Sequence, residues 1–183
     1  DADCGLYGPC LPMPPRQCAG AYSPNASCVY TDYASPAVAL QALPAARAAF
    51  TDAYAAAEAT GEATPTQPAV RGTLEYLLAA LDVEDVDLAS LVLVTDGEPT
   101  GCTFNSIEDT ATIVAGALAD TAAVTTHVIQ LGVPEADFNP IAEAGGTEAS
   151  HEVVAEGDTA AQIADFLRRI RAARDCRYRM PIP

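Results

Sequence analysis

Residues 91–99 read Leu-Val-Leu-Val-Thr-Asp-Gly-Glu-Pro, and the expected fold can be built outward from them. Four consecutive apolar residues followed by turn-forming residues predict a strand buried on both faces, as in the centre of a parallel sheet. In open α/β sheets, ligands bind just beyond the carboxyl ends of the strands, which is where Asp96 falls. A carboxylate at that position suits a cation. The alternative is that Asp96 caps the turn by accepting hydrogen bonds from backbone N–H groups.

Hydrophobic periodicity on both sides of this strand predicts alternating helices and strands. We expect an edge strand at residues 38–43 and further strands at 124–131 and 152–155. Helices are expected at residues 45–59, from Pro68 to about residue 81, from Ser106 to about residue 118, at 138–144, and from Asp158 or Thr159 onward. Thr66 is expected to cap the second of these helices, and Ser106 with Asp109 to form a capping box at the start of the third. His127, within the expected strand at 124–131, is interpreted as a structural residue. Strands separated by helices imply right-handed crossovers, so the predicted fold class is α/β with a doubly wound, mostly parallel sheet flanked by helices.

Residues 1–35 differ in composition from the rest of the chain and are predicted to form an irregular segment rich in cysteine and proline. This segment precedes an α/β domain at residues 36–183. An even number of cysteines without a Cys-x-x-Cys spacing favours disulfides over a zinc site. Disulfides in turn indicate an oxidising compartment outside the cytoplasm. The six candidates are Cys4, Cys10, Cys18, Cys28, Cys102 and Cys176.

The pairing of these cysteines stays open at this stage. Cys28 shortly precedes the expected edge strand and Cys102 follows the central strand, so both are expected at one rim of the sheet. A bridge between them would brace that rim. The alternative is that Cys28 pairs within the N-terminal cluster and that Cys102 is joined to Cys176 or left over.

The charge of the chain restricts its partners. Its 183 residues include 25 acidic side chains, nine arginines and no lysine, for a formal charge of −16. Nucleic acids and anionic membranes are polyanions, so both are poor partners for this chain. No run of about eighteen apolar residues is present, so no membrane span is expected. Without a Gly-rich phosphate loop or a Gly-x-Ser-x-Gly elbow, the sequence does not indicate an enzyme.

Three motifs in a fixed order carry a resemblance to a known family. Val-Thr-Asp-Gly-Glu-Pro at residues 94–99 is preceded by Ala-Thr-Pro-Thr-Gln-Pro-Ala-Val at 63–70 and followed by Ile-Ala-Glu-Ala-Gly-Gly-Thr at 141–147. In this order the motifs resemble a von Willebrand factor type A domain of the bacterial secreted kind, over about residues 36–183. The resemblance implies a doubly wound sheet, in agreement with the fold expected from the hydrophobic pattern.

The resemblance also implies a metal-ion-dependent adhesion site at the carboxyl edge of the sheet. There, Mg²⁺ or another divalent cation completes its coordination with a carboxylate from a protein partner. Asp96 matches the acidic residue after the central strand, and Thr64 matches the loop threonine that reaches the metal. Glu98, Thr66 and Phe104 are expected on the same face, in contact with the partner.

One motif of the family, Asp-x-Ser-x-Ser, does not occur in this sequence. In the family it follows the first strand and supplies the other metal ligands. We therefore expect the chain to be a fragment that lacks this strand and the helix after it. The alternative is a natural domain that has lost the metal site together with a core strand.

The expected function is that of a non-enzymatic, extracytoplasmic protein-interaction or adhesion module. An alternative is a Rossmann-like metal-dependent hydrolase or phosphatase that uses Asp96 as a metal-bound or nucleophilic carboxylate. A third possibility is a structural module of a larger envelope protein.

Overall fold

The computed structural model describes residues 26–57, 63–83, 89–120, 124–132, 137–154 and 156–175. Within them, helices and strands alternate from α2 onward, as the hydrophobic periodicity predicts. In chain order the elements are η2 (Tyr30–Tyr33), α1 (Ala46–Ala56), α2 (Thr66–Val83), β1 (Ser90–Thr95), α3 (Ile107–Ala119), β2 (Thr125–Leu131), α4 (Asn139–Ala144), β3 (His151–Val153) and α5 (Thr159–Asp175).

The three strands form one parallel sheet in the order β1-β2-β3. Along the β1–β2 pair, Ser90 lies opposite Thr125 and Thr95 lies opposite Gln130, so β1 is paired along its whole length. β3 continues the sheet from the second half of β2, beginning with His151 opposite Ile129. The prediction of an α/β fold with a parallel sheet flanked by helices is therefore confirmed, and the arrangement is compatible with a Rossmann-like fold.

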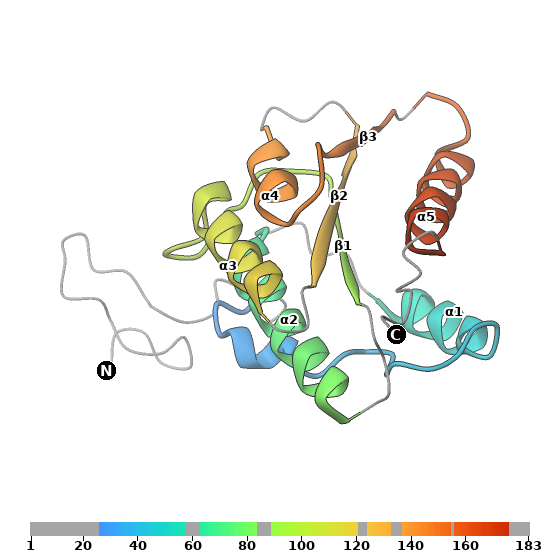
Figure 1. Ribbon diagram of the computed structural model, residues 1–183, viewed down its shortest axis with the longest axis horizontal. Helices are drawn as coiled ribbons and strands as arrows, with labels where there is room; N and C mark the ends of the chain where they lie inside the picture. The colour runs from blue at the N-terminus through green and yellow to red at the C-terminus, as the bar shows by residue number, and fades with distance from the viewer. Residues whose placement is uncertain are drawn as a thin grey trace, which may run out of the picture.

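Helices lie on both sides of the sheet, but they cover it unequally (Figure 1). One face packs against α2, α3 and α4 and contains the hydrophobic core. On the opposite face, Phe166 of α5 stacks on His151 with 4.2 Å between ring centroids and meets His127 edge-on at 6.1 Å. These contacts bring α5 onto β2 and β3. His127 thus has the packing role expected for it, and His151 has one that was not predicted.

The core joins side chains that are distant in the sequence. Its largest fully buried members come from β2, β3 and the helices α3 and α4 with their flanking residues. They include Phe138, Ile129, Ile141, Val114, Val124, Val128 and Val153. Val70 and Leu74 of α2 pack in one cluster with these residues, except for Ile129 and Val153, which lie outside that cluster. Through Val70 and Leu74, α2 packs against the same side of the sheet as Leu91 and Val128.

Two expectations for the sheet are wrong. Residues 38–43 form no strand, and Leu40 and Leu43 are exposed, because the local alternation of apolar residues finds no neighbouring strand to pair with. In the described part of the chain β1 is an edge strand, and β2 holds the central position. Val94 of β1 is 48% exposed, so β1 is not buried on both faces.

Helix boundaries agree with the sequence signals where side-chain caps are present. Ser106 accepts a hydrogen bond from the Asp109 N–H, and Asp109 accepts one from the Ser106 N–H, which forms the predicted capping box of α3. Asp158 caps α5 by accepting from the Ala161 N–H at 2.9 Å. Helix α2 starts at Thr66, slightly before the expected Pro68. The first turn of α2 is capped by Asn105, which lies outside the helix.

Two helical glycines give a matched test of the packing. A Cβ at Gly72 in α2 would lie 2.1 Å from the Tyr30 carbonyl oxygen, whereas a Cβ at Gly116 in α3 would meet nothing within 4 Å. We expect Gly72→Ala to destabilise the fold by about 2 kcal/mol and Gly116→Ala to stabilise it by about 1 kcal/mol. Urea unfolding of both variants measures these changes. Equal effects would show that η2 does not pack against α2 as described.

A second matched pair concerns buried threonines. The Thr126 hydroxyl is fully buried and has no hydrogen-bond partner among the described residues. The equally buried Thr110 hydroxyl donates to the Ser106 carbonyl oxygen at 2.9 Å. Thr126→Val removes an unsatisfied polar atom and is expected to stabilise by about 1 kcal/mol, whereas Thr110→Val is expected to destabilise by about 1 kcal/mol. The difference in thermal unfolding midpoint between the two variants measures this, and a less stable Thr126→Val would contradict it.

Candidate functional site

The candidate site lies where β1 ends and two loops meet. The loop from Asp96 to Asn105 leaves the carboxyl end of β1, and the turn at residues 63–65 leads into α2 beside it. Asp96 and Glu98 are exposed at the start of the first loop. This is the edge at which ligands bind in open parallel sheets. The structure therefore places both carboxylates at the predicted edge.

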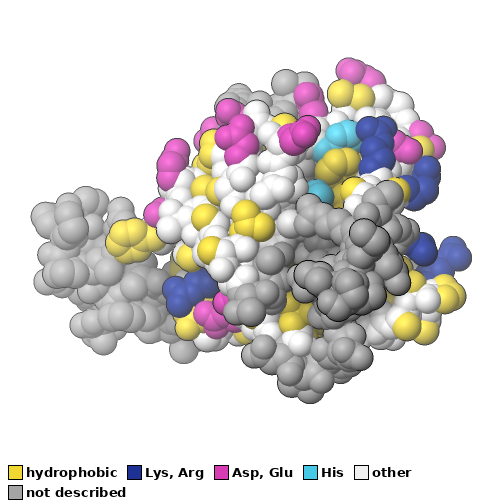
Figure 2. Space-filling view, viewed as in Figure 1, with side chains coloured by type: hydrophobic (Ala, Val, Ile, Leu, Met, Phe, Trp, Pro, Cys, Tyr) yellow, Lys and Arg dark blue, Asp and Glu magenta, His cyan; other side chains and the backbone are white. Residues whose placement is uncertain are grey.

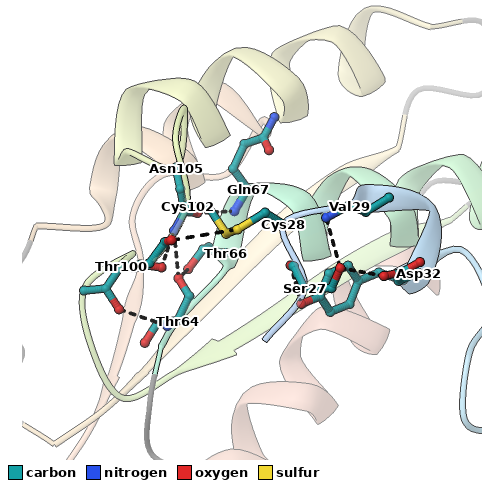
Figure 3. Close-up of a disulfide and its surroundings, with 12 residues drawn as sticks. Ser27, Cys28, Val29, Asp32, Thr64, Thr66, Gln67, Thr100, Cys102 and Asn105 are labelled. Carbon is teal, nitrogen blue, oxygen red and sulfur yellow. Dashed lines mark hydrogen bonds between the residues drawn. A yellow bond between two sulfur atoms is a disulfide. The ribbon is translucent and has the colours of Figure 1, made fainter. Parts of the chain in front are cut away.

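Asn105 joins the two loops through a single buried side chain (Figure 3). Its Nδ2 donates to the carbonyl oxygens of Thr64 at 2.9 Å and Thr100 at 2.8 Å. Its Oδ1 accepts a hydrogen bond from the Gln67 N–H at 2.8 Å, which satisfies one of the free donors in the first turn of α2. Asn105 thus caps a helix that begins 39 positions earlier in the sequence, at Thr66.

Backbone and hydroxyl hydrogen bonds reinforce this connection. The Thr64 N–H donates to the Thr100 hydroxyl, and the Thr100 N–H donates to the Thr64 carbonyl oxygen, each at 2.9 Å. The Thr95 hydroxyl donates to the Gly97 carbonyl oxygen at 2.9 Å and tightens the turn after β1. The loop is therefore held along its length by specific contacts.

A disulfide between Cys28 and Cys102 fixes the same loop to the N-terminal side of the domain (Figure 3). The two cysteines are 74 positions apart, and their Cα atoms are 5.6 Å apart. Of the two arrangements that the sequence left open, the structure thus contains the bridge between Cys28 and Cys102. The predicted disulfide cysteines Cys4, Cys10, Cys18 and Cys176 lie outside the described residues.

The residues next to Cys28 are held in place as well. The Tyr33 hydroxyl donates to the Ser27 carbonyl oxygen at 2.8 Å. Burial raises the pKa of Tyr33, and this outweighs the opposite effect of that hydrogen bond. The guanidinium carbon of Arg71 lies 3.8 Å from the ring centroid of Tyr30, which adds a cation–π contact between η2 and α2. The disulfide therefore connects the loop to an ordered anchor.

Phe104 is the unusual residue of the loop. Its φ angle is +58°, in the left-handed region that bulky side chains rarely adopt, and its side chain is 76% exposed. This backbone conformation costs about 1 to 3 kcal/mol and persists because the surroundings enforce it. Asn105 and Cys102, on either side of Phe104, supply that constraint. The loop thus holds an aromatic ring in solvent at a conformational cost.

The two threonines predicted for this face differ in position. Thr64 is half-buried, and its backbone carries the hydrogen bonds that link the loops. Thr66 is 4% exposed, and its hydroxyl is 3.4 Å from the Thr64 carbonyl oxygen, to which it donates. The side chain of Thr66 thus lies inside the protein and not on the predicted partner surface. It also leaves the capping of α2 to Asn105, contrary to the expectation that Thr66 would cap the helix.

The described residues offer few ligands to a cation. They contain no group of three or more His, Cys, Asp or Glu side chains that could hold a metal ion. Asp96 and Thr64 would supply one carboxylate and one hydroxyl, whereas Mg²⁺ requires about six oxygen ligands in octahedral geometry. These two residues alone do not supply the ligand set that Mg²⁺ requires.

Sequence reasoning missed the residues that organise the site. Asn105 precedes the capping box of α3 and looks like an ordinary loop residue, because two of its partners, Thr64 and Gln67, are 41 and 38 positions away. Thr100 likewise gives no local signal. The sequence shows only that polar residues precede the start of a helix, which is typical of a loop. This pattern does not identify hydrogen-bond partners that are distant in the sequence.

A scan against protein-family models found no match for this chain, and a search of curated proteins found no similar sequence. The resemblance to von Willebrand factor type A domains therefore remains a prediction that rests on the three sequence motifs.

Removal of the Asn105 side chain tests the connection between the loops. Asn105→Ala leaves the Gln67 N–H and the carbonyl oxygens of Thr64 and Thr100 without their partner. We expect a loss of about 3 kcal/mol in unfolding free energy and faster hydrogen exchange at the Gln67 amide. The neighbouring exposed Thr103→Ala serves as the control. Similar stability of the two variants would contradict the role assigned to Asn105.

Proposed function

We propose that this chain is an extracytoplasmic protein-interaction module, built on a doubly wound α/β domain of the von Willebrand factor A type. Its partner binds at the carboxyl end of β1, on the surface formed by Asp96, Glu98 and Phe104, which we call the loop surface. The proposal rests mainly on Phe104, an exposed aromatic ring held in a left-handed backbone conformation by buried contacts on its own loop.

Exposed aromatic residues on rigid supports are typical energetic centres of protein interfaces. The ordering of the loop by Asn105 and by the Cys28–Cys102 bridge means that little conformational entropy remains to be lost on binding. Asp96 and Glu98 add two exposed negative charges at the start of the same loop. This combination suits a partner surface that has an apolar pocket with basic groups at its rim.

The disulfide supports the assignment to an oxidising compartment, because such bonds are rare in reducing cytosol. No helix of the described chain is long and apolar enough to cross a membrane. An interaction module exposed outside the cytoplasm agrees with both observations. It also agrees with the formal charge of −16, which favours a basic protein surface over a polyanion.

The resemblance to von Willebrand factor A domains predicts a different contact, in which a divalent ion at Asp96 and Thr64 binds a carboxylate of the partner. The experiment below separates the two modes. Binding that requires Mg²⁺ and is lost with EDTA supports the ion-bridged mode. Binding that persists in EDTA and weakens with salt supports direct contact by the acidic side chains.

Photo-crosslinking identifies the surface and its partner together. A photoreactive phenylalanine analogue at position 104 is expected to capture a protein from the secreted and surface fraction of the source cells. The matched control places the same analogue at Tyr54 of α1, another aromatic residue, which is 87% exposed. With the captured partner purified, Phe104→Ala is expected to weaken its affinity by about thirtyfold, or roughly 2 kcal/mol, and Tyr54→Ala is expected to change it little.

The acidic residues are tested on the same complex. Asp96→Asn is expected to slow association several-fold at low salt, because a rim charge acts mainly on the encounter rate. Two outcomes would rule out the loop surface as the interface. One is that the analogue at position 54 captures the same protein as the analogue at position 104, and the other is that Phe104→Ala leaves the affinity unchanged.

A further inference from the structure

Basic charge in this chain is concentrated at one helix. Residues 165–183 contain six arginines and two acidic residues, whereas residues 1–164 contain three arginines and 23 acidic residues. In the described part of the first stretch, Arg168, Arg169 and Arg171 are exposed on α5. Basic side chains gather over this helix in Figure 2, whereas acidic side chains lie over the α3 and α4 region. A strongly acidic protein thus has one local basic surface.

Helical geometry turns this surface away from the sheet. Phe166 contacts His127 and His151 and therefore marks the side of α5 that faces the strands. At about 100° per residue, Arg168 lies about 200° and Arg171 about 140° around the helix from Phe166. Both arginines are therefore on the outer side of α5, where a further strand of the sheet could not cover them.

Asp165 orients two of the guanidinium groups. Its Oδ2 accepts from Arg169 Nε at 2.8 Å and also from Arg169 Nη2, and its Oδ1 accepts from Arg168 Nη1 at 3.3 Å. The hydrogen bond from Arg169, together with its charge, lowers the pKa of Asp165, so this carboxylate is ionised at neutral pH. One carboxylate cannot neutralise two guanidinium groups, and Arg171 forms no ion pair with any described residue. The cluster therefore keeps a net positive charge and free N–H donors.

Stabilisation of the helix end does not explain these positions. Arginines complement the negative end of a helix dipole, but this effect is confined to the last turn. Helix α5 ends at Asp175, so Arg168 and Arg171 lie seven and four positions before its end. Leu167 is 44% exposed and lies next to Arg171 on the helix surface, because the two are four positions apart. The outer side of α5 therefore combines positive charge with an exposed apolar side chain.

We propose that the surface formed by Leu167, Arg168 and Arg171, which we call the arginine surface, binds a short acidic segment of a partner protein. Guanidinium groups bind carboxylates through paired N–H···O hydrogen bonds. Leu167 contacts an apolar side chain of the segment. This inference does not depend on the loop surface, and it assigns the chain a second partner whose charge is opposite to that of the first.

The acidic remainder of the chain limits the size of the ligand. Charges interact over about 8 Å at physiological ionic strength. A short acidic segment on α5 is therefore attracted by the arginines and only weakly repelled by the rest of the molecule. A nucleic acid or an anionic membrane extends beyond that distance and meets the acidic residues elsewhere on the chain. A second copy of the chain is a poorer occupant, since two molecules with a formal charge of −16 repel each other.

Acidic peptides test this inference with the chain of residues 1–183. The probe is a fluorescently labelled Glu-Glu-Leu-Glu-Glu-Leu-Glu-Glu, and the matched peptide has glutamine at every glutamate position. Fluorescence anisotropy is expected to show saturable binding of the probe and affinity at least about tenfold weaker for the glutamine peptide. A thymidine oligonucleotide of equal charge is expected to bind more weakly than the probe, because it offers no apolar side chain to Leu167.

Variants of the protein locate the binding site. Arg171→Gln is expected to weaken binding of the probe about threefold, and Arg168→Gln with Arg171→Gln at least about tenfold. Arg47→Gln, at an exposed arginine of α1, removes the same charge as Arg171→Gln and is expected to leave binding unchanged. Arg168→Lys with Arg171→Lys keeps the charge and is expected to weaken binding less than the double change to glutamine. Circular dichroism checks that each variant keeps its helix content.

Several results would overturn the inference. Absence of saturable probe binding would do so, as would equal affinity for the two peptides or equal effects of Arg171→Gln and Arg47→Gln. Oligonucleotide binding as tight as that of the probe would identify the ligand as a general polyanion. An assembly of several copies that Arg168→Gln with Arg171→Gln dissociates would identify the occupant as a second copy. Either result would contradict the assignment to an acidic segment of a partner protein.

A different pair of measurements separates this inference from the proposed function. Phe104→Ala is expected to leave probe binding unchanged, and Arg168→Gln with Arg171→Gln is expected to leave the affinity of the partner captured at position 104 unchanged. Loss of probe binding in Phe104→Ala would place the acidic ligand at the loop surface and overturn this inference. Failure of the probe to bind the unaltered chain would rule out the arginine surface and leave the loop surface unaffected.

Discussion

The organisation of this protein depends on one buried amide. Asn105 makes three hydrogen bonds that connect the loop after β1 to the turn before α2 and cap the first turn of that helix. Loops usually lie at the surface and are mobile, because their backbone groups can be satisfied by water. Here the backbone groups of two loops are satisfied by one side chain, so the carboxyl end of the sheet is a fixed surface.

Other features of the site follow from that constraint. The Cys28–Cys102 bridge attaches the same loop to η2, and the close approach of Gly72 to Tyr30 attaches η2 to α2. These contacts form a closed path from α2 through the loop and back to α2. Within this path Phe104 is held with φ of +58° and with its ring in solvent. A costly backbone conformation that displays an apolar ring suits recognition better than packing, because the ring contributes little to the core.

The sheet is asymmetric in a way that complements this surface. One face is filled by α2, α3 and α4, whereas on the other side α5 lies over β2 and β3 (Figure 1), and Val94 of β1 is half-exposed. Acidic side chains are prominent over the α3 and α4 region, and arginines gather over α5 (Figure 2). Near the carboxyl end of β1, the exposed Val94 is therefore followed by the exposed carboxylates Asp96 and Glu98.

Local patterns were sufficient to predict the class of fold and most of its elements. Apolar runs predicted the strands, the capping box of Ser106 and Asp109 predicted the start of α3, and Asp96 was correctly placed at the carboxyl end of a parallel strand. These features depend on residues a few positions apart. The expected position of both cysteines at one rim of the sheet also suggested the Cys28–Cys102 bridge, although other pairings were equally compatible with the sequence.

Only the folded protein decided four other features, because each depends on contacts between residues tens of positions apart. They are the order of the strands, the burial of Thr66, the capping of α2 by Asn105 and the exposure of Phe104. An apolar strand carries the same pattern whether it lies at the centre or at the edge of a sheet, and only its neighbours in space distinguish the two.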